Sequence, residues 1–201
     1  GDKDPNMNPR LRTAIQAAKQ ANMPKENIKR AISKSESGDN KNYENLRYEG
    51  FGPFNTAIII ETLTDNKNRS ASSIRTVLQK NGGRLGETGS TKHMFTNCGI
   101  IHIEKNKISD EDALEASINA GAKDCFQFLD KHEITTEKED FYKVKTNLED
   151  KVDCLSYAAI EWRAKNYLNL DKDQSKKMIE VLRALEEIDD VQNIFTNAKI
   201  E

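Results

Sequence analysis

A glycine-rich stretch is the first candidate for chemistry in this sequence. It runs from Asn81 to Ser90 and contains four glycines. A phosphate-binding loop needs Gly-Lys-Ser/Thr at the start of a helix, and this stretch contains no lysine. Glycine most often serves backbone turns, so we interpret the stretch as turns, with contact to a ligand as the alternative.

Residues that could bind a metal ion do not have the required spacing. Asp2, Asp4 and Asn6 are spaced like the start of a calcium loop, but Met7 and Thr13 occupy the positions of its glycine and its bidentate glutamate. The histidines and cysteines share no metal-ligand spacing: His93, His102, His132, Cys98, Cys125 and Cys154. We interpret these histidines as structural or surface residues and these cysteines as buried small hydrophobic residues. The sequence therefore predicts no metal site, no cofactor and no catalytic residues, and we expect a protein that is not an enzyme.

Basic residues are the better candidates, because they fall in two groups that could contact phosphates. The first group lies within residues 10–34 and comprises Arg10, Arg12, Lys19, Lys25, Lys29, Arg30 and Lys34. The second group comprises Lys67, Arg69, Arg75, Lys80 and Arg84. Several cations on adjoining helices suffice for a salt-sensitive contact that does not depend on base sequence. An ordinary solvated helix face is the alternative for either group.

The charge is distributed unevenly along the chain. The formal net charge is only -2, but residues 1–42 carry 9 basic and 5 acidic residues, residues 43–98 carry 7 and 5, and residues 99–201 carry 15 and 23. Such asymmetry predicts a basic N-terminal part that faces a polyanion and an acidic part that faces away from it or toward a protein partner. No apolar run is long enough to span a membrane, and three widely separated cysteines favour a reducing compartment. We therefore expect a cytoplasmic protein.

The first residue group lies on a predicted helical hairpin. Asn8-Pro9 and Asn22-Met23-Pro24 each place a capping residue and a proline at a helix start. Apolar residues then recur at helical spacing, at Leu11, Ala14, Ile15 and Ala18 and again at Ile28, Ala31 and Ile32. Two short helices bury little surface, so we expect a further helix to complete a bundle. The polar segment 33–42 is the predicted linker.

The second residue group lies in a predicted α+β unit. We expect strands over 43–50 and 56–63, a helix over 68–80 that Asn66 or Asn68 caps, and a left-handed end at Gly82. Residues 92–96 could form another strand. A helix over 174–187 and a strand over 191–196 are too small for a separate domain, so we expect them to return to the sheet that begins at residue 43.

Between these parts the sequence predicts a β-α-β-β-α-β unit of the ferredoxin-like kind. We expect strands over 99–104, 125–129 and 141–146, helices over 110–120 and 148–155, and a last strand over 158–165. A single longer helix is the alternative for the last element.

Four long segments and the C-terminal end of the chain resemble the YebC family. They are DPNMNPRLRTAIQAAKQANMPKENIKRAI (4–32), YEGFGP (48–53), LTDNKNRS (63–70), KNGGRLGETGS (80–90) and DDVQNIFTNAKI (189–200), in the same order as in the family. The resemblance implies a helical bundle and two α+β domains around a central cavity, with the ferredoxin-like domain inserted into the other. It also implies a further basic N-terminal segment, absent from this sequence, and a GPGG-like turn where this chain has Gly52-Pro53-Phe54-Asn55.

The resemblance also implies a role in gene expression. Family members are known as probable transcriptional regulators that bind DNA, mitochondrial relatives activate translation of a cytochrome c oxidase subunit, and bacterial members have been linked to ribosomes stalled on proline-rich sequence. We therefore predict a multidomain α and α+β protein with a helical hairpin over 1–40, an α+β domain over 43–97 and 171–201, and an inserted ferredoxin-like domain over 98–170.

The predicted function is that of a DNA-binding transcriptional regulator. The first alternative is a translation factor that contacts ribosomal RNA, and the second is a protein-binding scaffold that uses the acidic insert. We expect a monomer without membrane contact.

Overall fold

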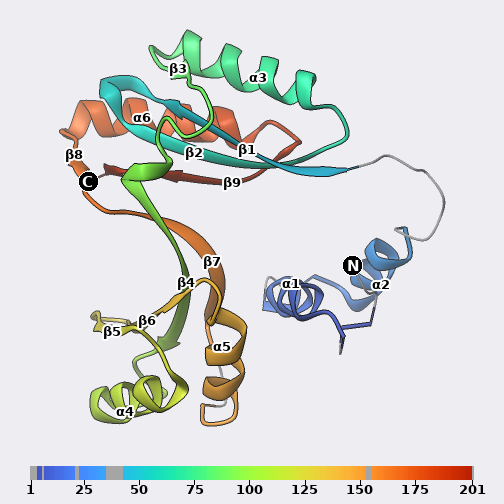
Figure 1. Cartoon of the computed structure of the whole chain (residues 1–201), viewed down its shortest axis with the longest axis vertical. Coiled ribbons are helices and arrows are strands. Elements are labelled where there is room, and N and C mark those ends of the chain that lie inside the picture. Colours follow the sequence, from blue (N-terminus) through green and yellow to red (C-terminus); the bar gives the residue numbers. More distant parts are fainter. Residues whose placement is uncertain (1–3, 6, 21–22, 35–42, 153–154, 201) are drawn as a thin grey trace. The chain divides into compact units, whose positions relative to one another are not determined.

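The structure is a computed structural model that describes residues 4–5, 7–20, 23–34, 43–152 and 155–200 (Figure 1). The chain divides into two compact units. Unit 1 comprises residues 1–39 and 97–161, and unit 2 comprises residues 40–96 and 162–201. Six α-helices occur among the described residues, and none of them is long and apolar enough to cross a membrane.

Unit 2 is built on a four-stranded antiparallel sheet with the order β3-β1-β2-β9. Its strands are β1 (Glu44–Phe51), β2 (Ala57–Thr64), β3 (Arg84–Leu85) and β9 (Val191–Thr196), and its helices are α3 (Lys67–Lys80) and α6 (Lys172–Glu186). The shorter elements are η1 (Pro53–Asn55), η2 (Lys92–Met94), β8 (Leu168–Asn169) and β10 (Ala198–Lys199). The predicted return of a C-terminal helix and strand to the first sheet is confirmed, because β9 pairs with β2.

The two faces of this sheet differ because side chains alternate along each strand. The helices α3 and α6 cover one face (Figure 1). Ile58 and Ile60 point to this face, where they pack with Ile74, Leu78 and Met178. The opposite face carries a smaller cluster, comprising Ala57, Ile59, Phe95, Trp162 and the partly buried Phe195. The helices α3 and α6 are therefore anchored on one face, and their outer sides are exposed to solvent.

Unit 1 contains a ferredoxin-like domain. Its elements are β4 (Phe95–Glu104), α4 (Asp110–Ala120), β5 (Asp124–Gln127), β6 (Lys131–Glu137), α5 (Phe141–Glu149) and β7 (Tyr157–Ala164). The sheet order is β5-β6-β4-β7, and β6 is antiparallel to both neighbours. This is the predicted β-α-β-β-α-β fold, and the strand expected near residues 158–165 is confirmed as β7. The longer helix that was its alternative is wrong.

Two predicted elements of this domain are wrong. Residues 141–146 were expected to form a strand and 148–155 a helix, but α5 spans Phe141–Glu149. Its buried residues are Phe141, Val144, Lys145 and Leu148, which is the spacing of one helix face. The missing strand is β6, whose buried positions alternate at His132, Ile134 and Thr136. Only one of these three is strongly apolar, so the alternation is hidden in the sequence.

The N-terminal part of unit 1 is a helical hairpin of α1 (Pro9–Gln20) and α2 (Lys25–Lys34). Ile28 is buried, but Ala31, which was expected in the buried stripe, is exposed. Residues 35–42 of the predicted linker lie outside the described residues, as does the predicted cap Asn22. The fold is thus multidomain, with a helical N-terminal part and two α+β domains, one inserted into the other. The exact domain limits given above stay a prediction.

Candidate nucleic-acid interface

Local sequence sets the start of both helices of the hairpin. The Asn8 side-chain oxygen accepts the backbone N–H of Leu11 at 3.1 Å, and Pro9 occupies the first helical position, where no N–H is needed. At the second start, the Pro24 carbonyl accepts the backbone N–H of Asn27 at 2.9 Å. The Asn8 cap and the backbone turn at Pro24 mark where α1 and α2 begin.

Most of the predicted cations on the hairpin are exposed to solvent. The exposed residues are Arg10, Lys19, Lys25, Lys29 and Arg30. Arg12 is half-buried, and its Nε donates to the carbonyl of Pro5 at 3.0 Å. Lys34 ends α2, but its side chain lies outside the described part of the structure.

Positive charges outnumber negative charges on α2. Lys25 and Lys29 are four residues apart, so they lie on the same side of the helix. Like charges at this spacing destabilise a helix by about 0.2–0.5 kcal/mol. Arg30 follows on the neighbouring side. Among the described residues of α2, Glu26 is the only carboxylate, and these three cations make no side-chain ion pair. Glu26 is three residues before Lys29 and four before Arg30, spacings that attract, so it offsets this repulsion. The excess of positive charge remains for an anionic partner.

One side of α1 contacts the inserted domain. Lys145 of α5 is buried, and its Nζ donates to the Gln16 side chain at 2.6 Å and to Glu149 at 3.0 Å. The Gln16 amide nitrogen also donates to Glu149 at 3.2 Å. Lys19 lines a cavity of about 620 Å³ beside this cluster. Burial raises the pKa of Tyr142, and the positive charge of Arg10 opposes the rise. Arg12 is four residues before Gln16 and therefore lies on the same side of α1, so only the cations of α2 are separate from this contact.

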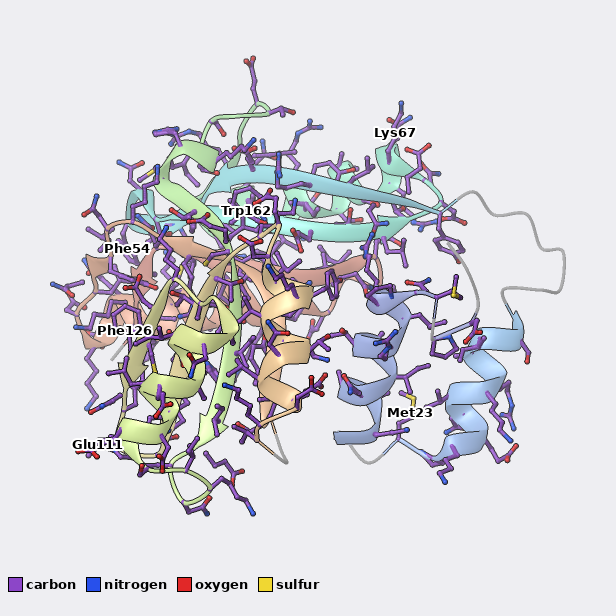
Figure 2. The ribbon with its side chains drawn as sticks, turned by 60° about the horizontal axis from the view of Figure 1, so that its bottom comes forward. Met23, Phe54, Lys67, Glu111, Phe126 and Trp162 are labelled. Atoms are coloured by element: carbon purple, nitrogen blue, oxygen red, sulfur yellow. The ribbon has the colours of Figure 1, made fainter. Side chains whose placement is uncertain are left out.

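The second group of basic residues, called the second cluster below, starts at the N-terminus of α3. The side-chain oxygen of Asn66 accepts the backbone N–H groups of Asn68 at 3.2 Å and Arg69 at 3.1 Å, which confirms the predicted cap. Lys67 is exposed beside this cap (Figure 2). Because Asn66 already occupies two of the free amides, the helix end is less available to an external anion than the sequence suggests.

Arg69 is held by two carboxylates and serves the fold. Its Nη2 donates to Asp65 at 2.8 Å and to Asp190 at 2.7 Å. Asp190 also accepts from Ser70 at 2.7 Å and Thr64 at 3.1 Å, and the pKa of Asp190 is lowered, first by the hydrogen bond from Arg69. The hydrogen bond to Asp190 correspondingly raises the pKa of Arg69. The charge of Arg69 is thus balanced inside unit 2.

The other cations of the second cluster are spread over the surface. Arg75 and Lys80 are both exposed on α3, but five residues correspond to about 140° around a helix. They therefore lie at opposite margins of the exposed side. The guanidinium of Arg84 lies 4.4 Å from the centre of the Phe51 ring, a cation–π contact. The structure gives this cluster a lower charge density than α2.

Glu49 is a buried structural residue that the sequence did not reveal. Its side chain is fully buried, and its Oε2 accepts the backbone N–H groups of Thr91 at 2.9 Å and Lys92 at 2.7 Å. Burial alone would raise the pKa of Glu49, but hydrogen bonds from the amides of Thr91, Gly89 and Lys92 outweigh it, so this pKa is lowered. Glu49 therefore fixes the end of the glycine-rich stretch and places Lys92 on the surface.

The glycine-rich stretch itself behaves as turns in the structure. Gly82 and Gly89 have φ of 79° and 90°, where a side chain would be strained. A Cβ on Gly83 would lie 2.4 Å from the carbonyl oxygen of Phe51. These three glycines are accounted for by backbone geometry, which supports the interpretation as turns.

Two of the histidines make contacts within the inserted domain. His102 Nε2 lies 2.9 Å from Glu133 Oε2, and His132 Nε2 lies 2.8 Å from Asp110 Oδ1. Among the described residues, no three His, Cys, Asp or Glu side chains come close enough together to hold a metal ion. Cys98 is buried and Cys125 is half-buried, whereas Cys154 lies outside the described residues.

Comparison with known proteins covers nearly the whole chain. The family description "TACO1/YebC second and third domain" matches residues 43–198, and "TACO1/YebC protein N-terminal domain" matches residues 1–38. A probable transcriptional regulatory protein of Pelagibacter ubique is 51% identical over 197 residues, covering 98% of this chain and 82% of the relative. Its counterpart from Zymomonas mobilis is 43% identical over 201 residues, covering 100% of this chain and 81% of the relative. The crystal structure of a conserved hypothetical protein from Aquifex aeolicus is similar with a TM-score of 0.86 and 40% identity, covering 100% of this chain and 84% of that one.

Proposed function

We propose a function for this chain, which belongs to the TACO1/YebC family. It is a cytoplasmic regulator of gene expression that binds DNA through α1 and α2. The relatives from Pelagibacter ubique and Zymomonas mobilis are both named probable transcriptional regulatory proteins, which supports the regulatory role. In this proposal the protein acts by binding, without a catalytic step.

The observation that carries the proposal is the unbalanced positive charge of α2. Lys25, Lys29 and Arg30 are exposed and lack a carboxylate partner among the described residues. Each phosphate that a protein neutralises releases condensed counterions, and the logarithm of the binding constant then falls with the logarithm of salt by about 0.9 per contact on duplex DNA. The α2 cations would contribute a slope of about -2.7 if all three engage phosphates.

A contact with structured ribosomal RNA is the alternative, and the same cations would make it. It is favoured by the absence of a base-reading motif from the sequence, because cations alone bind phosphates without selecting a base sequence. The two readings differ in their target rather than in their surface.

The test compares two triple variants with the same change in net charge. The first replaces Lys25, Lys29 and Arg30 with glutamine. The control replaces Lys172 and its neighbours Lys176 and Lys177, which are exposed on α6, with glutamine. Binding of the whole chain to a duplex DNA and to purified ribosomes is measured over a range of salt concentrations.

We expect the α2 variant to reduce the salt slope on DNA by about 2–3, and the α6 variant to reduce it by less than about 1. Equal slopes for the two variants would remove the hairpin from the interface. Co-sedimentation with ribosomes that depends on α2, with no measurable binding to the duplex, would refute DNA and support the ribosomal alternative.

A further inference from the structure

The inserted domain has a free sheet edge at β5. In the part of the chain that the structure describes, β5 pairs with β6 on one side and with no strand on the other. The backbone N–H of Phe128 donates to Lys131 at 2.8 Å, which marks a hydrogen-bonded pair at the hairpin end. Because such pairs alternate along antiparallel strands, the backbone groups of Cys125 and Gln127 point outward. This edge can accept another strand.

The surface around this edge is unusually apolar. Exposed large hydrophobic side chains are concentrated in residues 114–129, which contain Leu114, Ile118, Phe126, Phe128 and Leu129. Phe126 pairs in register with Glu133, on the sheet face opposite the half-buried Cys125, which packs against the core (Figure 2). Phe126 is 48% exposed. Natural edge strands are commonly protected by lysine, proline or bulges, and the four residues of β5 (DCFQ) include neither lysine nor proline.

The charge near this edge is strongly negative. Residues 110–130 contain six acidic residues and one basic residue: Asp110, Glu111, Asp112, Glu115, Asp124, Asp130 and Lys123. The basic residue is neutralised, because the Nζ of Lys123 lies 2.6 Å from Glu137. Two lysines outside this range lie at the hairpin end: the Nζ of Lys105 is 3.2 Å from Asp110, and the Nζ of Lys131 is 5.9 Å from the centre of the Phe128 ring. The excess of negative charge therefore depends on the acidic residues other than Asp110. Glu111 is exposed on α4, a helix that contacts β5 (Figure 2). A partner that lies along β5 therefore gains most if it is positively charged.

We propose that the outer edge of β5 docks an extended segment of a partner protein that is rich in lysine and arginine. The segment adds a strand to the sheet through the backbone groups of Cys125 and Gln127, its apolar side chains lie on Phe126, and its cations face the acidic residues of α4 and β5. Strand addition of this kind takes its affinity from backbone hydrogen bonds and its specificity from alternate side chains. A nucleic acid is disfavoured because its phosphates would meet this negative charge, and a second copy of the chain is disfavoured because two acidic edges repel.

The test uses the whole chain and two defined peptides. One peptide alternates lysine with valine, and the other alternates glutamate with valine. Hydrogen exchange of the backbone amides of Cys125 and Gln127 is followed by NMR. We expect the lysine peptide to slow exchange of both amides by at least about tenfold, as for amides that join a β-ladder, and the glutamate peptide to leave it unchanged.

Two sets of variants separate backbone pairing from charge. Gln127→Pro removes one outward N–H, which an edge strand tolerates, and Gln127→Ala is its matched control. Gln127→Pro should lose the protection at Cys125, while Gln127→Ala keeps it. Should Gln127→Pro prove unfolded in the NMR spectrum, the double variant Asp124→Lys with Glu111→Lys decides, because it should weaken lysine-peptide binding at least about tenfold without touching the backbone.

Three results would overturn the proposal. The first is unchanged exchange at Cys125 and Gln127 in saturating lysine peptide. The second is a response of Phe126 to oligouridine in place of the peptide, which would assign the surface to nucleic acid. The third is protection that rises with protein concentration alone, which would assign the edge to a second copy. None of these results bears on α2, so the proposal and the nucleic-acid function can fail separately.

Discussion

Replacing Glu49 with glutamine should destabilise unit 2 by about 2 kcal/mol at neutral pH. The buried carboxylate accepts two backbone amides, those of Thr91 at 2.9 Å and Lys92 at 2.7 Å. Hydrogen bonds to a charged group contribute about 1.5–3 kcal/mol and neutral ones about 0.5–1.5, so removing the charge costs about 1 kcal/mol per bond. Glutamine keeps the shape of the side chain, which limits the loss to this electrostatic part.

The effect should depend on pH in a defined direction. The pKa of Glu49 is lowered from its ordinary value of 4.5. A carboxylate of this kind stabilises the protein above its unfolded-state pKa and loses that contribution as the pH falls through the lower folded-state pKa. The difference between the native protein and Glu49→Gln should therefore be constant from about pH 5 to pH 8 and shrink in more acidic solution.

Urea unfolding at several pH values measures this difference, and hydrogen exchange of the Thr91 and Lys92 amides shows whether the loss is local. Glu87→Gln is the matched control, because it makes the same substitution in the same glycine-rich stretch at an exposed position. A loss below about 0.5 kcal/mol for Glu49→Gln, which is the usual size for surface substitutions, would refute the reasoning. So would a difference that persists unchanged in acid.

Two further substitutions test other contacts of unit 2. Asp190→Asn should lower the urea midpoint more than Asp189→Asn at its exposed neighbour, because the hydrogen bond from Arg69 that lowers the pKa of Asp190 is weakened when the carboxylate charge is removed. The midpoint difference should narrow as the pH falls through the lowered pKa, and a difference that does not narrow would contradict this. Phe54→Gly should raise the melting temperature, because Phe54 has φ of 61°. The left-handed conformation costs a side chain about 1–2 kcal/mol and glycine loses about 0.5–1 kcal/mol in backbone entropy, which leaves a gain of about 0.5–1 kcal/mol. The loss of the ring, which is 42% exposed, reduces this gain, so the expected rise is small. Thermal unfolding that shows no gain would mean that contacts of the Phe54 ring outweigh the backbone strain.

Elements with a strong local signal were predictable from sequence. The predicted limits 110–120 and 191–196 agree with α4 and β9. Ser109 caps α4 and Gly121 ends it in the left-handed conformation, so both boundaries are encoded within a few residues. The family resemblance also located the turn at residues 52–55, where Phe54 and Asn55 adopt the positive φ that glycine would tolerate.

Elements whose burial depends on polar residues were not predictable. The strand β6 buries His132 and Thr136, and α5 buries Lys145. Each of these is polar, so the pattern of apolar residues alone assigned α5 to a strand and overlooked β6. Their burial is possible because distant residues provide partners, such as Asp110 for His132 and Gln16 for Lys145.

The candidate interface shows the same limit. Exposed cations on α2 could be identified from helical spacing, because the relevant contacts are within one helix. The neutralisation of Arg69 could not be identified from the sequence, because Asp190 lies 121 residues away along the chain. The same holds for the hydrogen bond between Glu49 and the backbone of Thr91, because these residues are 42 positions apart in the sequence. The signal in the sequence is a glutamate inside the predicted strand 43–50, since a charged residue that a sheet buries requires specific partners.

The pairing of β2 with β9 delays the folding of unit 2 during synthesis on the ribosome. The backbone N–H of Ala57 bonds to the side chain of Asn197 across 140 residues. During synthesis, the contiguous inserted domain emerges in full before α6 and β9 are made. For most of its elongation, the nascent chain therefore has an unpaired strand edge at β2. Ile58 and Ile60 also remain without the cover of α6 during this time. Translation that is slowed or terminated before residue 172 would leave this species exposed to aggregation and to chaperones.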